Sequence, residues 1–133
     1  MSERNVLVVT VDTEANPYEE GRKAIRRLQR GDAGKRRATV RFQDESQLTD
    51  VFNERTYKLL RALRDEEPSS IRETARRVGR DKKNVHEELT TLEALGVIHF
   101  EEDGRAKRPV FPYDELVVTP LAAGSNDSAQ ATP

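Results

Sequence analysis

The stretch that decides the fold lies at residues 70–96 and reads SIRETARRVGRDKKNVHEELTTLEALG. Ser70 and Glu73 have the spacing of a capping box, and Gly79 supplies a stop after about two helical turns. Asp81 can then cap a second helix after only a short connection. The stretch therefore predicts two helices joined by a glycine-containing turn, the geometry of a helix-turn-helix motif.

Apolar residues recur along both of these helices at the spacing of a single buried face. In the second helix Val85, Leu89 and Leu92 follow at intervals of four and three, and Gly96 ends the pattern. Residues outside this stripe are free to contact a partner. The first helix carries its own stripe at Ile71, Ala75 and Val78.

The flanking segments predict one more helix before the motif and a hairpin after it. A short helical piece surrounds residues 46–52, and Asn53 can cap a helix that Pro68 prevents from continuing. After Gly96 a strand-like run leads to Asp103 and Gly104, a pair suited to a type I′ turn, and then to a second run. Three helices followed by a hairpin with a basic arm is the order of a winged helix.

The N-terminal part has a different pattern. Residues 5–13 are rich in β-branched residues and predict a strand, Asn16 caps a helix over 17–30, and residues 38–43 alternate as a second strand. The expected class is α+β, a winged helix-turn-helix with an N-terminal strand-helix-strand appendage. The expected divisions are the appendage at 1–45, the winged domain at 46–120 and a disordered tail at 121–133.

Composition limits the function classes. The 133 residues carry a net charge of −1 and no cysteine, which excludes disulfides and thiolate metal sites and favours an intracellular protein. The N-terminal apolar run is far shorter than the roughly 20 residues of a membrane span, so we expect a cytoplasmic protein without membrane contact. Two basic islands, at 22–41 and 72–83, are the places where a polyanion could dock.

Catalysis is not expected. The segment HEELT at 86–90 begins like the zinc-binding HExxH signature, but Thr90 stands where the second histidine would be. The only other histidine, His99, falls in the predicted hairpin. The sequence contains no P-loop, dinucleotide fingerprint or nucleophile elbow, and we expect neither a metal nor a cofactor.

From about residue 53 to 118 the chain resembles the winged helix-turn-helix of transcription regulators related to the MarR and ArsR groups. The run LTTLEALGVI at 89–98 is the most diagnostic part, and the GRDKKNVH turn at 79–86 is most similar to a haloarchaeal family of putative DNA-binding proteins. The resemblance implies binding to double-stranded DNA, usually as a homodimer. Glu87 and Glu88 depart from it, because they make the presumed reading helix more acidic than usual.

The candidate contacts with DNA come from three places. Lysines at the start of the second motif helix can reach phosphate or guanine, while Glu87 could accept from cytosine and Thr90 could meet a thymine methyl group. The first motif helix and the basic arm of the hairpin would grip the backbone or the minor groove. The full set is Arg72, Arg76, Arg77, Arg80, Lys82, Lys83, Asn84, His86, Glu87, Thr90, Arg105, Lys107 and Arg108.

Alternatives stay open for several of these residues. Asn84 can support the turn instead of reading a base, and the basic arm of the hairpin can form cross-strand ion pairs with residues 101–103. The whole domain could instead serve as a module for protein contact, for which the row of Glu87, Glu88 and Glu93 would suit a basic partner. The basic N-terminal helix could extend the DNA footprint, bind an acidic protein or contact a second subunit.

Overall fold

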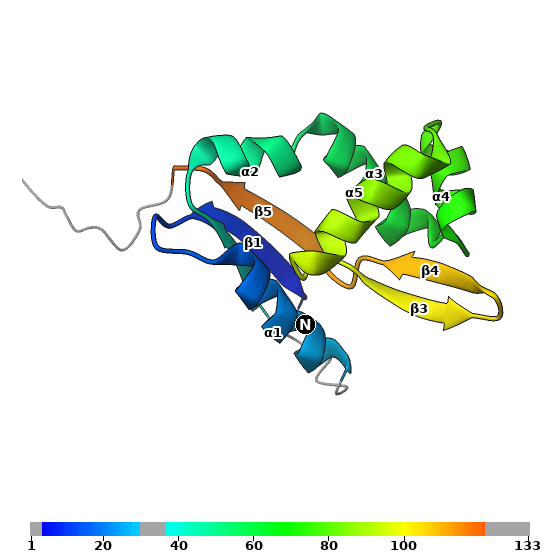
Figure 1. Ribbon diagram of the computed structural model, residues 1–133, viewed down its shortest axis with the longest axis horizontal. Helices are drawn as coiled ribbons and strands as arrows, with labels where there is room; N and C mark the ends of the chain where they lie inside the picture. Colours follow the sequence, from blue (N-terminus) through cyan, green and yellow to red (C-terminus); the bar gives the residue numbers. More distant parts are fainter. Residues whose placement is uncertain (1–3, 30–36, 122–133) are drawn as a thin grey trace, which may run out of the picture.

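The computed structural model describes residues 4–29 and 37–121, which form the α+β class predicted from the sequence. Its helices and strands are shown in Figure 1. In chain order they are β1 (Val6–Val11), α1 (Pro17–Gln29), β2 (Arg37–Phe42), α2 (Glu45–Val51), α3 (Glu54–Glu66), α4 (Ile71–Val78), α5 (Lys82–Ala94), β3 (His99–Asp103), β4 (Ala106–Val110) and β5 (Glu115–Thr119).

The first, second and last strands form one parallel sheet in the order β2-β1-β5. Val8 in the central strand pairs with Thr39 on one side and with Val117 on the other. The segment at 115–119, which we had assigned to the second domain, therefore completes the sheet of the N-terminal part within the same chain. The division at residue 45 remains a prediction.

The strand pattern explains which side of this sheet is buried. Leu7 and Val9 are fully buried, whereas the alternate residues Val6 and Val8 are half-buried. Phe42 of β2 meets Phe52 after α2 edge to face, with ring centroids 6.1 Å apart. The same core continues into α3, α5 and the segment after β4, so the sheet and the helices share one apolar interior.

The predicted helix starts in the central part are confirmed. Asn53 accepts from the backbone N–H groups of residues 55 and 56, Ser70 from Glu73, and Asp81 from Lys83 and residue 84. Gly79 ends α4 with a φ of 69°, a conformation that favours glycine. Two short, capped helices, α4 and α5, are thereby joined by a tight connection.

The hairpin of β3 and β4 forms as predicted, but its turn differs from the expected one. The register pairs Asp103 with Ala106, so Gly104 and Arg105 are the two loop residues. Gly104 has a φ of 66°, and Arg105 does not share the positive φ. A positive φ at the first central position alone matches a type II′ turn, so the expected type I′ turn at Asp103 and Gly104 is wrong.

Helix α1 lies against the end of α5 (Figure 1). A Cβ atom on Gly21 would lie 2.7 Å from the Cα atom of Leu95 and still closer to the carbonyl oxygen of Ala94. Only a residue without a side chain allows this approach. The side chains of Ile25 and Leu28, the predicted end of this helix at residue 30 and residues 122–133 of the predicted tail lie outside what the structure describes.

Within the described ranges, none of the helices combines the length and apolar character that crossing a membrane requires.

Candidate functional site

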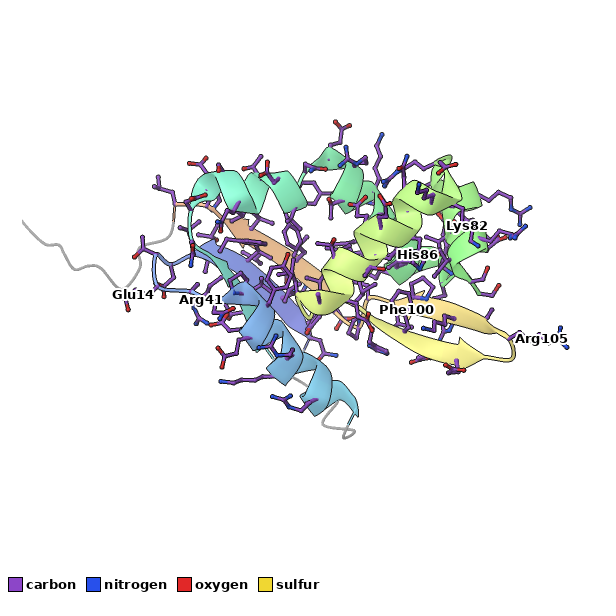
Figure 2. All side chains as sticks on the ribbon, in the orientation of Figure 1. Glu14, Arg41, Lys82, His86, Phe100 and Arg105 are labelled. Atoms are coloured by element: carbon purple, nitrogen blue, oxygen red, sulfur yellow. The ribbon has the colours of Figure 1, made fainter. Side chains whose placement is uncertain are left out.

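The start of α5 is an exposed cationic surface. Lys82 and Lys83 are both exposed, and neither forms an ion pair with another described residue. Asp81 fixes the backbone beneath them by accepting from the Lys83 N–H at 3.0 Å. The two charges are therefore presented on an ordered turn of helix, with their side chains available to an anion (Figure 2).

The next turns of α5 carry polar side chains on the same exposed side. His86, Glu87 and Thr90 are exposed, as the stripe of buried apolar residues predicts. Asn84 is also exposed, but it lines the hollow that Arg80 and Glu88 border. The Thr90 hydroxyl donates to the backbone carbonyl of His86 at 2.9 Å, which leaves the Thr90 methyl group and oxygen to face outward. This face mixes donors, an acceptor and one negative charge at Glu87.

Two of the three arginines of α4, Arg76 and Arg77, form ion pairs within the molecule. Arg77 binds Glu66 at 2.9 Å and Glu73 at 2.6 Å, and Arg76 also binds Glu73. Hydrogen bonds from Arg77 and then Arg76 hold the pKa of the Glu73 carboxyl below its ordinary value. Arg72 is exposed and has no ion pair among the described residues, so it is the most available cation of this helix.

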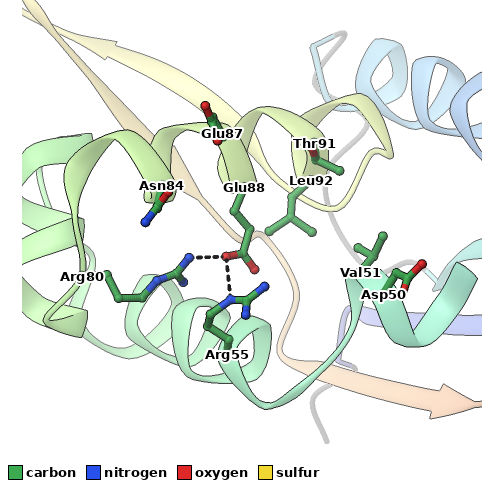
Figure 3. A pocket seen from close by; sticks show the side chains of 9 residues that line it. All are labelled: Asp50, Val51, Arg55, Arg80, Asn84, Glu87, Glu88, Thr91 and Leu92. Atoms are coloured by element: carbon green, nitrogen blue, oxygen red, sulfur yellow. Dashed lines mark hydrogen bonds and ion pairs between the residues drawn. The ribbon is translucent and has the colours of Figure 1, made fainter.

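The turn is held by a half-buried carboxylate. The Arg80 guanidinium donates to Glu88 Oε1 at 2.7 Å (Figure 3). The Thr56 hydroxyl, which also contacts the carbonyl oxygen of Val51, lies 2.8 Å from Glu88 Oε2. Arg55 approaches the same carboxylate at 3.8 Å. Glu88 therefore does not stand in an exposed row with Glu87 and Glu93, as the protein-contact alternative suggests, because its side chain turns toward α3.

Glu88 also borders a hollow of about 480 Å³ between α5 and the α2–α3 junction. Its side chain is only 14% exposed, and that of Arg80 is 20% exposed. Arg80 Nη1 is buried and has no hydrogen-bond partner among the described residues. The arrangement fixes α5 to the start of α3 and removes Arg80 from the surface.

The hairpin has three cations with different neighbours, Arg105, Lys107 and Arg108. Arg105 is exposed at the tip and has no ion pair in the described part of the chain (Figure 2). Lys107 lies 5.9 Å from the centre of the Phe100 ring. Arg108, on the opposite face of the strand, binds Glu101 at 2.7 Å. The cross-strand alternative is thus realised for Arg108, whereas Arg105 is available to a partner.

A second contact supports this pair. His99 Nε2 lies 3.2 Å from Glu101 Oε2, and the hydrogen bonds from His99 and then Arg108 lower the pKa of Glu101. Neither His99 nor His86 belongs to a cluster of metal-binding side chains among residues 4–29 and 37–121.

Sequence reasoning missed three members of the network at the turn, Arg55, Thr56 and Glu88. A signal for Glu88 was present, since it follows Val85 by three residues and precedes Leu92 by four, which places it beside the buried stripe. Nothing in the spacing of Arg55 or Thr56 points to a carboxylate that lies more than thirty residues further along the chain.

Comparison with known proteins gave a family. The model of the HVO_A0114 family matches residues 51–118, just over half of the chain. The chain belongs to the HVO_A0114 family. Among curated proteins and among solved structures, the comparisons found no match.

The HVO_A0114 match is consistent with the haloarchaeal resemblance seen in the sequence. It covers α3, α4, α5, the hairpin and most of β5, and so contains every candidate contact residue. The first two strands and α1 lie outside it.

Proposed function

We propose that the chain is a DNA-binding transcription regulator with a MarR/ArsR-like winged helix-turn-helix, acting as a homodimer in the cytoplasm and not as an enzyme. In this proposal α3, α4 and α5 are the three helices, and β3 with β4 is the wing. The observation that supports it best is the pair of exposed lysines on the capped first turn of α5, which have no ion pair with any residue of 4–29 or 37–121. Such a turn at the start of a reading helix suits the major groove.

The proposed contacts follow the availability of each side chain. Lys82 and Lys83 meet phosphate or guanine, and Glu87 and Thr90 face base edges further along the groove. Arg72 of α4 grips the backbone as this helix crosses it. Arg105 at the tip of the hairpin reaches the neighbouring minor groove.

The paired arginines have a different role in this proposal. The carboxylates of Glu73 and Glu66 offset the charge of Arg76 and Arg77, so these two arginines attract phosphate less than free cations do. Arg80 holds the turn through Glu88 and contacts no DNA directly. The protein consequently depends on few free cations, as its net charge of −1 suggests.

A second candidate function, a module for protein contact, draws support from Glu87. This exposed carboxylate stands on the same face as the lysines, which is unfavourable beside phosphate and favourable beside a basic protein. The dependence on salt separates the two functions. Binding to DNA weakens steeply as salt rises, with a log-log slope of about −0.9 for each neutralised phosphate, because condensed counterions are released. Contact between Glu87 and a basic protein is screened by salt but releases no condensed counterions, so its salt dependence is shallower.

The test begins with genome-wide mapping of the bound DNA and continues with a salt series on the best site. Replacing both Lys82 and Lys83 with alanine is expected to reduce affinity roughly tenfold or more and to reduce the salt slope by about two. The matched control is the double replacement of Arg76 and Arg77 with alanine, which removes the same charge from α4. Equal affinity of the lysine variant and the unchanged protein would remove α5 from the DNA contact.

A further inference from the structure

The outer edge of β5 is an unpaired strand edge within the described part of the chain. β5 stands at the end of the sheet order, next to β1 alone. Glu115 donates its N–H to the carbonyl of Asn5 at 3.3 Å, so the backbone groups of Glu115 point toward β1. Backbone groups alternate in direction along a strand. Leu116 and Val118 therefore direct their N–H and C=O groups away from the sheet.

We infer that this edge is the dimer interface, where the β5 strands of two copies pair antiparallel around a two-fold axis through Val117. The inference deepens the proposed function, since it rests on the homodimer proposed there and names the surface that forms it. Unpaired strand edges invite pairing with another chain, and a strand edge is complementary to its own copy.

The two edges of the sheet differ in the features that prevent such pairing. The other edge strand, β2, carries Arg41, which binds Glu20 of α1 at 3.2 Å. Charged side chains and covering helices are the usual protection of an edge. β5 begins with one charged residue, Glu115, which lies 3.5 Å from Arg4. The rest of the strand, 116–119, reads LVVT and holds no charge, proline or glycine. β5 is thus the less protected of the two edges.

The register of the proposed pair is self-consistent. A two-fold axis at Val117 sets Leu116 opposite Val118 of the second copy, and these are the residues whose backbone groups point outward. Each such pair exchanges two hydrogen bonds, and Val117 meets its own copy in the closer, non-hydrogen-bonded position. Glu115 falls opposite Thr119, so no like charges meet.

The side chains on the core side of β5 support the same register. Leu116 and Val118 are half-buried and line a hollow of about 580 Å³ beside the strand. Tyr57 and Leu60 of α3 form the rest of its apolar part, and Arg4, Arg61 and Arg64 are among its charged residues. Pairing would set Leu116 and Val118 of the second copy beside them on the same face. Leu116 and Val118 of the two copies would then form one continuous apolar row across the two-fold axis and would be less exposed to water.

The resulting assembly would be one six-stranded sheet in which the β5 strands are the two central ones. The two α5 helices would be related by the same two-fold axis, as reading a pseudo-palindromic site requires.

The absence of cysteine from the chain allows a direct test by single-cysteine crosslinking. Antiparallel neighbours in the non-hydrogen-bonded position are about 4.5 Å apart between Cα atoms, within the range that a disulfide spans. The variant Val117→Cys, oxidised without DNA, is expected to form a covalent dimer at least about tenfold faster than the control, because a preformed pair gives a high effective concentration.

The control is Thr39→Cys. Thr39 and Val117 pair with the same residue, Val8, from opposite edges of the sheet, and both are half-buried. Crosslinking of Thr39→Cys at the same rate or faster would overturn the proposal.

The second measurement is the mass of the unmutated protein by size exclusion with light scattering. Twice the 15.1 kDa of one chain is expected. A monomer would overturn the proposed interface and leave residues 122–133 of the same chain as the next candidate to cover β5. Both readouts are made without DNA, so a failure of DNA binding leaves them unaffected, and the lysine variants test that binding separately.

Discussion

The two ends of α5 are held in opposite ways. At its C-terminal end Leu92 and Leu95 are buried, and α1 approaches so closely that Gly21 has no room for a side chain. At its N-terminal end Lys82 and Lys83 are exposed and unpaired among the described residues. One helix is thereby fixed by packing at one end and displays side chains at the other. Packing at the C-terminal end holds α5 in place, so the side chains at its N-terminal end are exposed without any movement of the helix.

Disrupting the packing of α1 against the C-terminal end of α5 should have the largest effect on stability. Gly21→Ala places a Cβ atom against the backbone of Ala94 and Leu95, which no side-chain rotation can relieve. We expect a loss of unfolding free energy of about 3 kcal/mol, measured by chemical denaturation. The control is Gly104→Ala, where a Cβ atom meets nothing within 4 Å and only the positive φ opposes it, at about 1–2 kcal/mol. Equal losses for both variants would contradict the close approach of α1 and α5.

Between the two ends, Glu88 links α5 to α3 and to the turn. Glu88→Ala leaves the Arg80 guanidinium without its carboxylate partner, whereas the Thr56 hydroxyl keeps the carbonyl oxygen of Val51 as an acceptor. A loss of about 2 kcal/mol is expected in the same denaturation experiment, because the group removed is a charged acceptor that is mostly buried.

The matched control for this change is Glu87→Ala, one residue earlier on the exposed side. Surface replacements of this kind stay within about 0.5 kcal/mol. If the two variants were equally stable, Glu88 would not be the group that holds the turn.

Loss of the Asp81 cap at the N-terminal end of α5 should cost less stability than loss of the packing at its C-terminal end. Asp81→Ala removes the acceptor for the Lys83 N–H and is expected to cost about 1 kcal/mol. Hydrogen exchange at the first turn of α5 should accelerate. Asp81→Ser restores a capping oxygen without the charge and should recover most of the loss. Failure of serine to recover it would mean that the charge of Asp81, and not the cap, stabilises the turn.

The smallest expected effect is on the pKa of Glu73, the carboxylate that Arg76 and Arg77 of α4 bind. Arg77 and then Arg76 lower the pKa of Glu73. A carboxyl with a lowered folded pKa contributes stability above its unfolded pKa and loses it as pH falls through the folded value. NMR titration should place Glu73 below its ordinary range and should move it back toward that range in Arg77→Ala. An unchanged titration in this variant would separate Arg77 from Glu73 in solution.

Local signals predicted most of the fold, because caps and apolar spacing act over a few residues. Ser70, Asp81 and Gly79 determine where α4 and α5 begin and end, and the structure has these boundaries as expected. The pairing of β1 with β5 lies beyond such local signals. No local rule states whether two distant open edges meet within a chain or between chains.

The candidate site was less predictable, since charge type does not reveal charge partners. Arg77, Arg108 and Lys82 look alike in the sequence, yet the first two bind carboxylates and the third binds none of the described residues. The difference arises from side chains brought near by tertiary structure, such as Glu66 beside Arg77. Which of these cations bind DNA stays a prediction.

The sheet is completed late during synthesis, because β5 is the last strand in the chain and pairs with the first, β1. Thr10 and Thr119, which are hydrogen bonded across β1 and β5, are separated by 109 positions in the chain. When β1 and β2 have left the ribosome, the helices and the hairpin have still to be made before β5 can join. Such distant contacts slow folding. The nascent protein therefore exposes one side of β1 until its last strand arrives, and a chaperone would find its binding surface there.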